Sequence, residues 1–535
     1  MRREDKWQNL AQGWQVIHPR SEDNMTQDVG SYFRSGFHQI RSAPGLIIPS
    51  LISGSLSSSV GWAIMLTFLI LSLPLLAEVA PIAERNQDLI SEIIEEENFE
   101  DDIDPKMEEL VEVFSGLVPE LIGLSILFLI LLCVIVIISF ALYAWVEAGT
   151  IGYLWQGVTT TMDFRNFLYY ANNYSFQIMG LWISMAIFSI VLFLMPFFTL
   201  VFLPPPANIA IFSLSIVLCI ILWLVAMVLL FFAEESIVIE GMGVIGSIKR
   251  SKNIVAGNIG SVLIYIFILV VFVMTYGVIA GIFEVIAVLF NSSLSPLFVL
   301  FSLIILVPWM QLSKLNFFLD RTGVAVREIG KEIEIIKIAR EFMSRSPYIL
   351  VNFVMKNKAY LLASLFVCGI GVGIGYYIGY LFSFLSDDAM MILSEGLEEQ
   401  IFFGPYISMP LIDGIYYLSN NINVAMDLGL SGIFLGVPVI AGGIVNGTIT
   451  GLVYGILPVE TATMFIGVHG VPEDLALVIA TATGIKLGVN IMRGPENGAE
   501  AFMETIEVVL ATSLLLGIAA FLEAFVTPIV VSLMV

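Results

Sequence analysis

Residues 121–146 read LIGLSILFLILLCVIVIISFALYAWV, a stretch without one charged side chain. The hydrocarbon core of a bilayer is about 30 Å thick, and about 20 apolar residues in a helix are enough to cross it. Lipid offers no partners for backbone N–H and C=O groups, so a spanning segment must satisfy them within itself, as an α-helix does. This stretch therefore predicts a transmembrane helix and an all-α fold.

The same kind of apolar run recurs along the chain. Its 535 residues are 58% hydrophobic and only 13% charged, whereas a soluble globular protein carries about 25% charged residues. A water-soluble fold is therefore excluded. We predict a polytopic helical membrane protein with about eleven transmembrane helices in two bundles, six at residues 60–79, 121–146, 176–203, 209–232, 259–290 and 297–312, and five at residues 360–385, 424–444, 447–465, 475–492 and 506–535.

Few side chains suit catalysis or cofactor binding. Cys133, Cys219 and Cys368 each lie inside an apolar run, so they predict neither a disulfide framework nor a thiolate metal site. A zinc or haem site would need more histidines than the three present. We therefore predict no catalytic, cofactor-binding or metal-binding residues, no cofactor and no enzyme activity. The formal charge of -23 also makes nucleic acid an unsuitable partner.

The positions of the basic residues indicate how the chain is oriented across the membrane. Short loops rich in Lys and Arg stay on the cytoplasmic side, and this excess falls on residues 249–252 and 321–358, while residues 80–120 and 386–415 are acidic. We expect a multi-pass plasma-membrane protein with a cytoplasmic N-terminus and with its C-terminus outside. The acidic outer loop 80–120 either binds a cation or a cationic partner or is simply a solvated face, and charge runs are usually solvated faces.

The hydropathy groups the chain into four segments. Residues 1–34 form a cytoplasmic N-terminal segment, 35–320 a six-helix membrane domain, 321–358 a basic cytoplasmic linker, and 359–535 a second membrane domain. The linker has apolar residues at helical spacing, which predicts an amphipathic helix. That helix either lies on the anionic inner leaflet or bridges the two domains. Its predicted apolar stripe is Val326, Ile329, Ile333, Ile336, Ala339 and Met343.

Three segments of the first domain carry a family resemblance. They read SGFHQIRSAPGLII at 35–48, EAGTIGYLWQGVTTTMDFRNFLYYANNYSF at 147–176 and EESIVIEGMGVIGSIKRSKNIVAGNIG at 234–260. Over residues 35–318 the chain resembles the six-helix membrane domain that precedes the catalytic barrel of certain bacterial glycerophosphodiester phosphodiesterases and occurs alone in archaeal proteins. The barrel is absent from this chain, so the resemblance implies a membrane domain without diesterase activity.

Glycines recur every four residues in the second domain. Such stripes let helix backbones approach closely in lipid, where small residues favour helix association. They predict a compact bundle, and the alternative is that the glycines line a pore or allow hinges. The two principal stripes are Gly371, Gly375 and Gly379, and Gly443, Gly447, Gly451 and Gly455.

Polar residues within or beside the apolar runs are candidate functional residues, because an ionisable group inside the bilayer is costly. Lys486 is the natural partner for Glu523 or Glu473, and we expect Lys486 and Glu523 to lie inside the bundle. A bundle-facing pair would satisfy the desolvation requirement without implying chemistry. The full set of intramembrane polar and motif residues is Asn420, Asn421, Asn446, Gly447, His469, Gly470, Glu473, Lys486, Arg493 and Glu523.

These residues lie in short motifs that carry a second resemblance. In order, the motifs are NNINVA at 420–425, VNG at 445–447, HGVPEDLA at 469–476, TGIKLG at 483–488, RGP at 493–495 and LEAFVTP at 522–528. With these motifs, residues 360–535 resemble the stage II sporulation protein M family, with Val468 standing where that family usually has proline. The resemblance implies a noncatalytic role, since in spore formers the family member is a membrane partner of cell-wall hydrolases that remodel the septum. The fusion of the two domains resembles an archaeal arrangement.

Three classes of function remain at this point. A scaffold that organises partner proteins or shapes the membrane during envelope remodelling agrees with the resemblance and with the glycine stripes; its partners would be lipids and either other membrane proteins or further copies of the chain. A transporter or channel would line its path with Asn446, His469, Glu473, Lys486 and Glu523. An intramembrane hydrolase using His469 and Glu473 lacks a nucleophile motif.

Overall fold

The computed structural model describes residues 28–85, 115, 118–202, 204, 207–290, 292–327, 334–386 and 409–532. Of this part, 92% is helical, and it contains no strand, which confirms the all-α fold. Residues 86–114 of the predicted acidic outer loop and residues 1–27 of the N-terminal segment lie outside the described residues. Ten helices in the described part are long and apolar enough to cross a membrane.

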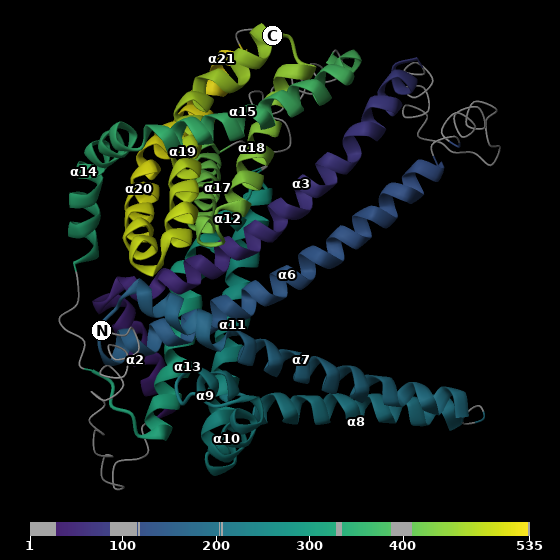
Figure 1. Cartoon of the computed structure of the whole chain (residues 1–535), viewed down its shortest axis with the longest axis vertical. Helices are drawn as coiled ribbons and strands as arrows, with labels where there is room; N and C mark the ends of the chain where they lie inside the picture. Colours follow the sequence, from purple (N-terminus) through teal and green to yellow (C-terminus); the bar gives the residue numbers. More distant parts are fainter. Residues whose placement is uncertain are drawn as a thin grey trace. The chain divides into compact units, whose positions relative to one another are not determined.

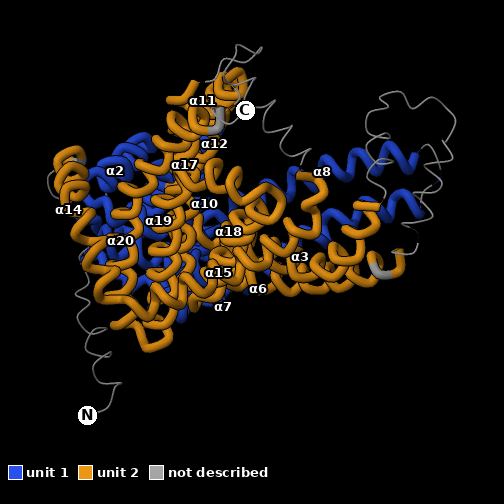
Figure 2. Tube along the Cα trace, turned by 90° about the horizontal axis from the view of Figure 1, so that it is seen from above, with its two compact units in different colours: residues 1–50, 144–274, 304–333 blue, residues 51–143, 275–303, 334–535 orange. Residues whose placement is uncertain are grey.

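The helices form two compact units (Figure 2). Unit 1 comprises residues 1–50, 144–274 and 304–333, and unit 2 comprises residues 51–143, 275–303 and 334–535. Each unit is therefore assembled from segments that are distant in the sequence. The four-segment division of the chain, with a boundary at residue 359, stays a prediction.

Unit 1 is built around two helices from opposite ends of the unit, α2 and α13. Tyr32 stacks on Phe317 with ring centroids 4.9 Å apart and donates a 2.6 Å hydrogen bond to Asp320. The buried amides of Gln39 and Asn316 exchange hydrogen bonds of 3.1 and 3.0 Å. These contacts fix α2 on α13. The helices that lie wholly in unit 1 are α2 (Val29–Ser42), α7 (Phe164–Phe202), α8 (Ala207–Leu229), α9 (Ala233–Val238), α10 (Val244–Gly257) and α13 (Val307–Thr322), with the 3-10 turn Pro44–Ile47.

Unit 2 contains the C-terminal helices and parts of α3, α6 and α11 (Figure 1). The helices α3 (Ile48–Arg85), α6 (Val118–Thr159) and α11 (Ile259–Val288) each continue from one unit into the other. The remaining helices of unit 2 are α12 (Ser295–Phe301), α14 (Ile335–Lys356), α15 (Lys358–Leu381), α17 (Pro410–Leu430), α18 (Val437–Ile456), α19 (Val459–Arg493), α20 (Pro495–Phe521) and α21 (Thr527–Ser532), with the π-helical stretch Leu522–Val526 and the 3-10 turns Ser383–Leu385 and Ser431–Ile433. The π-helical stretch Ser302–Leu306 begins in unit 2 and ends in unit 1.

The two predicted glycine stripes meet between α15 and α18. A Cβ placed on Gly375 would collide with the backbone of Thr448 and would lie 2.7 Å from the amide nitrogen of Leu452. A Cβ on Gly451 would lie 2.8 Å from the amide nitrogen of Tyr376. The glycines therefore pack backbone against backbone and leave no space for a side chain, as small residues do between helices in lipid.

The contacts of α15 and α18 advance in the same direction along both helices. Gly371 faces Gly447, whereas Gly379 faces Gly455. The two helices are therefore parallel, and the chain between them must return over the length of the bundle before α18 begins.

Helix α17 makes this return. Near its start Gly414 faces Ala524, and near its end Gly429 faces Val509, so α17 is antiparallel to α20. It has 21 residues, about 32 Å at 1.5 Å per residue, which is enough to cross a bilayer. Because α17 contains two aspartates and three asparagines, it is more polar than the ten candidate membrane helices and is not one of them.

The predicted spans 424–444 and 447–465 are wrong. The chain leaves the helical conformation between α17 and α18, where Leu435 and Gly436 have φ of 61° and 75°. A second break precedes α19 at Pro458, which cannot donate a backbone hydrogen bond to a continuing helix. Both apolar runs therefore bridge a helix break that hydropathy alone does not reveal. Each of the other predicted spans overlaps a candidate membrane helix of the structure, although the predicted bounds 203, 290, 385 and 535 lie beyond the ends of those helices.

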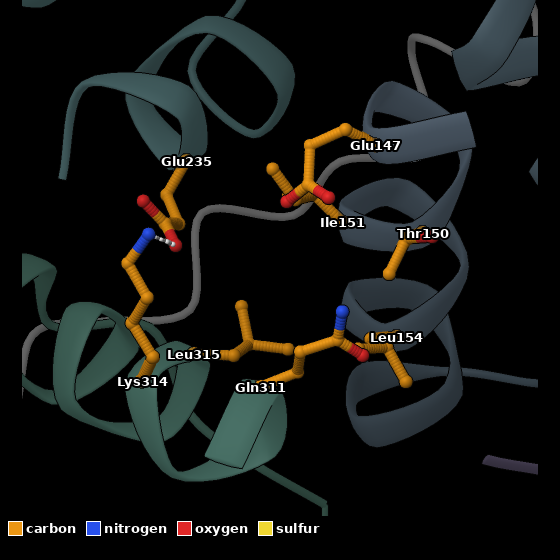
Figure 3. Close-up of a pocket in the computed structure, with 8 residues that line it drawn as sticks. All are labelled: Glu147, Thr150, Ile151, Leu154, Glu235, Gln311, Lys314 and Leu315. Atoms are coloured by element: carbon orange, nitrogen blue, oxygen red, sulfur yellow. Dashed lines mark ion pairs between the residues drawn. The ribbon is translucent and has the colours of Figure 1, made fainter. Parts of the chain in front are cut away.

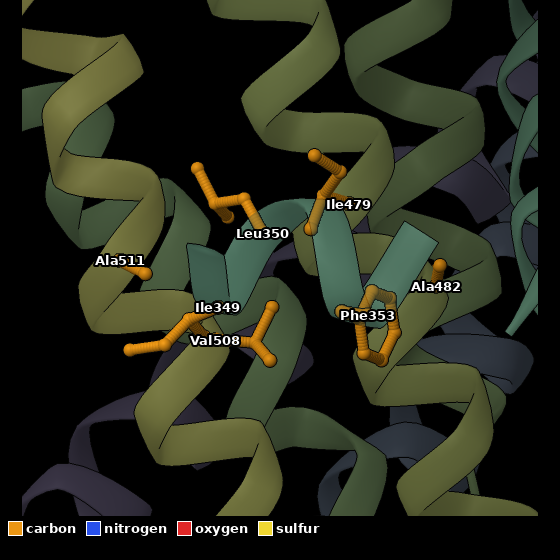
Figure 4. Packing of buried hydrophobic residues seen from close by; sticks show 7 residues of the cluster. All are labelled: Ile349, Leu350, Phe353, Ile479, Ala482, Val508 and Ala511. Atoms are coloured by element: carbon orange, nitrogen blue, oxygen red, sulfur yellow. The ribbon is translucent and has the colours of Figure 1, made fainter. Parts of the chain in front are cut away.

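The predicted linker helix begins later than expected and buries a different face. Residues 324–327 are not helical, residues 328–333 lie outside the described residues, and α14 starts at Ile335. Ile336, in the predicted stripe, is 87% exposed. The buried face instead carries Ile349, Leu350 and Phe353, which pack on Ile479 and Ala482 of α19 and on Val508 and Ala511 of α20 (Figure 4).

The glycine packing makes a testable prediction. Gly375→Ala should destabilise unit 2 by about 1–3 kcal/mol, the usual cost of overpacking, because the new methyl group has no space. Gly373→Ala, on the same helix with nothing within 4 Å, should be neutral or slightly stabilising, since alanine favours a helix over glycine. Thermal unfolding in detergent measures both. Equal effects of the two substitutions would contradict the backbone packing.

Candidate functional site

Three of the predicted polar residues come together in unit 2. His469 and Glu473 are four residues apart on α19 and so share one helix face, and Glu523 lies in the π-helical stretch that follows α20. One nitrogen or oxygen atom of each side chain lies within 4.8 Å of one such atom of each of the others. π-Helical turns occur frequently at functional sites. We name these three residues the polar cluster.

Neighbouring polar groups orient the polar cluster. The Nδ1 atom of His469 lies 3.0 Å from the buried hydroxyl of Thr527. Asn420 donates a 3.2 Å hydrogen bond to the side-chain oxygen of Asn421, and the side chain of Asn421 lies beside Glu473. The NN motif of α17 therefore reaches the polar cluster.

The predicted pairing of Lys486 with Glu523 or Glu473 is wrong. The Nζ atom of Lys486 lies 2.5 Å from the Oε2 atom of Glu504 on α20. Glu523 instead lies 3.9 Å from the Nε2 atom of His469. Among the residues that the structure describes, no lysine or arginine forms an ion pair with Glu473 or Glu523.

The remaining predicted residues are not members of the polar cluster. Asn446 donates a 2.7 Å hydrogen bond to the carbonyl of Gly442 on its own helix. Gly447 belongs to the α15–α18 contact, and Gly470 is buried within α19. Arg493 is exposed at the end of α19. The functional role of these residues stays a prediction.

Two pairings were not predicted, Lys486 with Glu504 and Ser58 with Asp427. Glu504 lies two residues before the predicted span 506–535, so the sequence placed it outside the bundle, whereas α20 begins at Pro495. Asp427 accepts a 2.5 Å hydrogen bond from Ser58 of α3. Asp427 is an acidic residue within an apolar run, the same signal that singled out Glu523.

Unit 1 holds a second group of charges that sequence reasoning missed. Glu147 on α6, Glu235 on α9, and Gln311 and Lys314 on α13 line one small cavity of about 40 Å³ (Figure 3). A cavity of this size has room for a water molecule. The charged residues lie directly after predicted apolar runs, where they were assigned to loops.

Lys314 contacts two adjacent glutamates of α9, Glu234 and Glu235. Its Nζ atom lies 2.8 Å from the Oε1 atom of Glu235 and 3.5 Å from the Oε2 atom of Glu234. The other oxygen of Glu234 accepts a 2.8 Å hydrogen bond from Trp182 of α7. Glu235 is only 4% exposed, and its Oε2 atom is buried without a hydrogen-bond partner. Lys314 therefore holds α9 against α13. Among the described residues, the Oε2 atom of Glu235 has no hydrogen-bond donor, and Glu235 lines the cavity.

A double-mutant cycle tests the corrected pairing. Lys486→Met and Glu504→Gln should show a coupling energy of about 1–3 kcal/mol in unfolding experiments, as expected for residues in direct contact. Lys486→Met combined with Glu523→Gln serves as the matched control and should be additive. Coupling of Lys486 to Glu523 in place of Glu504 would contradict the structure.

A model of a known protein family matches the C-terminal part of the chain. No curated protein and no solved structure matches the chain. The expected resemblance of residues 35–318 to the membrane domain of glycerophosphodiester phosphodiesterases stays a prediction. Residues 297–528, from α12 to the first turn of α21, match the family model of Stage II sporulation protein M, which supports the predicted resemblance and moves its start from residue 360 to residue 297.

Proposed function

We propose that this integral membrane protein is a noncatalytic scaffold that holds partner membrane proteins, or shapes the membrane around them, during envelope remodelling. The backbone contact of α15 with α18 carries this proposal, because two parallel helices without space between them form a rigid element. The match of residues 297–528 to the sporulation family adds to it, since the resemblance implies a membrane partner of other proteins rather than an enzyme.

A transporter or channel is the second candidate, and the polar cluster is the observation that favours it. Polar side chains near interrupted helices are typical of transporter sites. However, Glu473 and Lys486 are 13 residues apart on α19, about 20 Å along the helix axis, and Lys486 is already paired with Glu504. Two separate polar groups support a packed bundle better than they support a continuous path.

Two measurements on the intact chain decide between these functions. We expect cross-linking in native membranes to capture a defined membrane partner, and Gly375→Leu, which disrupts the α15–α18 contact, to abolish the capture. Gly277→Leu, at an open position of α11, is the matched control and should retain it. In proteoliposomes we expect no cation or solute flux above that of empty vesicles. Flux that Glu473→Gln abolishes would establish the transporter instead.

We further propose that the linker is cytoplasmic and that the acidic loop is outside. In a cysteine-free background, Ser115→Cys should react with a membrane-impermeant thiol reagent in intact cells, and Ser344→Cys on α14 should react only after permeabilisation. Both positions are exposed in the structure. The opposite labelling pattern would show an inverted orientation.

A further inference from the structure

We propose that His469, Glu473 and Glu523 bind a divalent transition-metal ion. Nitrogen and oxygen ligands bind zinc at about 2.1 Å, so two ligands of one ion are at most about 4.2 Å apart. The candidate ligand atoms all lie within 4.8 Å of one another. Around one tetrahedral ion the ligand atoms are about 3.4 Å from one another, so side-chain movements of up to about 1 Å would place all three around one ion.

The surroundings of His469 match those of a metal ligand. A ligating histidine commonly donates its other ring N–H group to a neighbouring oxygen, which fixes the ring. The Nδ1 atom lies 3.0 Å from the hydroxyl of Thr527, and the Nε2 atom is on the side of Glu523, at 3.9 Å. The side chain of Asn421 lies beside Glu473. The Nδ1 contact with Thr527 thus leaves the Nε2 atom of His469 on the side of Glu523.

Charge balance gives an independent reason for a cation. Glu473 and Glu523 are neighbours within an apolar bundle, and no lysine or arginine of the described residues forms an ion pair with either. Lys486, the nearest candidate in the sequence, is bound to Glu504. Carboxylates taken out of water need a compensating charge, and one divalent ion supplies it.

The donor set selects the class of metal. Calcium and magnesium prefer sites made of oxygen atoms alone, whereas an imidazole with two carboxylates suits zinc, manganese, iron or cobalt. The ion would join α19 to the π-helical end of α20, and one position would remain for water. This inference departs from the sequence-based prediction of no metal site, and it does not depend on the proposed scaffold role.

Cobalt(II) is the probe for the experiment, because its visible absorption reports its ligands directly. The tag-free intact chain in detergent should bind about one cobalt ion, zinc should displace it, and zinc should raise the unfolding temperature. Glu473→Gln and Glu523→Gln, which preserve the shape of the side chain, should each weaken binding at least about tenfold, and Thr527→Val should weaken it about tenfold. Glu460→Gln, an exposed position in the first turn of α19, is the matched control and should leave binding unchanged.

Two results would overturn the metal site. One is the absence of saturable cobalt and zinc binding by the wild-type chain, which would mean that protons balance the two carboxylates. The other is unchanged binding in both glutamine variants, which would place the metal elsewhere. Size-exclusion chromatography establishes that each variant is folded. Metal binding without vesicle flux would leave the scaffold proposal intact, and flux without metal binding would contradict both proposals.

Discussion

Helices α15 and α18 are in contact through their backbones because glycines line both of them. Lipid tails are as apolar as leucine side chains, so burial of apolar surface does not hold helices together within a membrane. Close approach of the backbones provides the attraction instead, and it requires glycine at each contact position. Because the pair is parallel, α17 must return along the bundle, and this return brings its asparagines beside the polar cluster. The glycine contact thus determines the topology of the matched region and the composition of its candidate site.

Ion pairs between charged side chains connect neighbouring helices within each unit. In unit 1 Lys314 joins Glu234 and Glu235, and in unit 2 Lys486 joins Glu504. Each pair links different helices, since an unpaired charge is costly where water is excluded. The polar cluster differs, because no lysine or arginine of the described residues forms an ion pair with either of its two carboxylates. This difference is the physical reason for considering it a binding site rather than a structural pair.

The sequence predicted the all-α membrane fold and the glycine stripes, because both depend on local composition and spacing. It also selected His469, Glu473 and Glu523, since polar residues are conspicuous in apolar runs. It did not predict the partner of Lys486, because Glu504 stands just outside an apolar run although α20 already includes it. The breaks before α18 and α19 were missed for a related reason: hydropathy averages over a window and does not detect a backbone turn at Leu435 and Gly436. Contacts between distant segments, such as Ser58 with Asp427, need the fold itself.

The parallel contact of α15 and α18 is the central claim, and distances between spin labels measured by electron paramagnetic resonance test it most directly. Labels replace Leu362 near the start of α15 and either Val437 or Ile449 on α18, three positions with exposed side chains. Val437 and Ile449 are 12 residues apart, about 18 Å along the axis. The account predicts a clearly shorter distance from Leu362 to Val437 than from Leu362 to Ile449. A shorter distance to Ile449 would show antiparallel helices and would contradict the account.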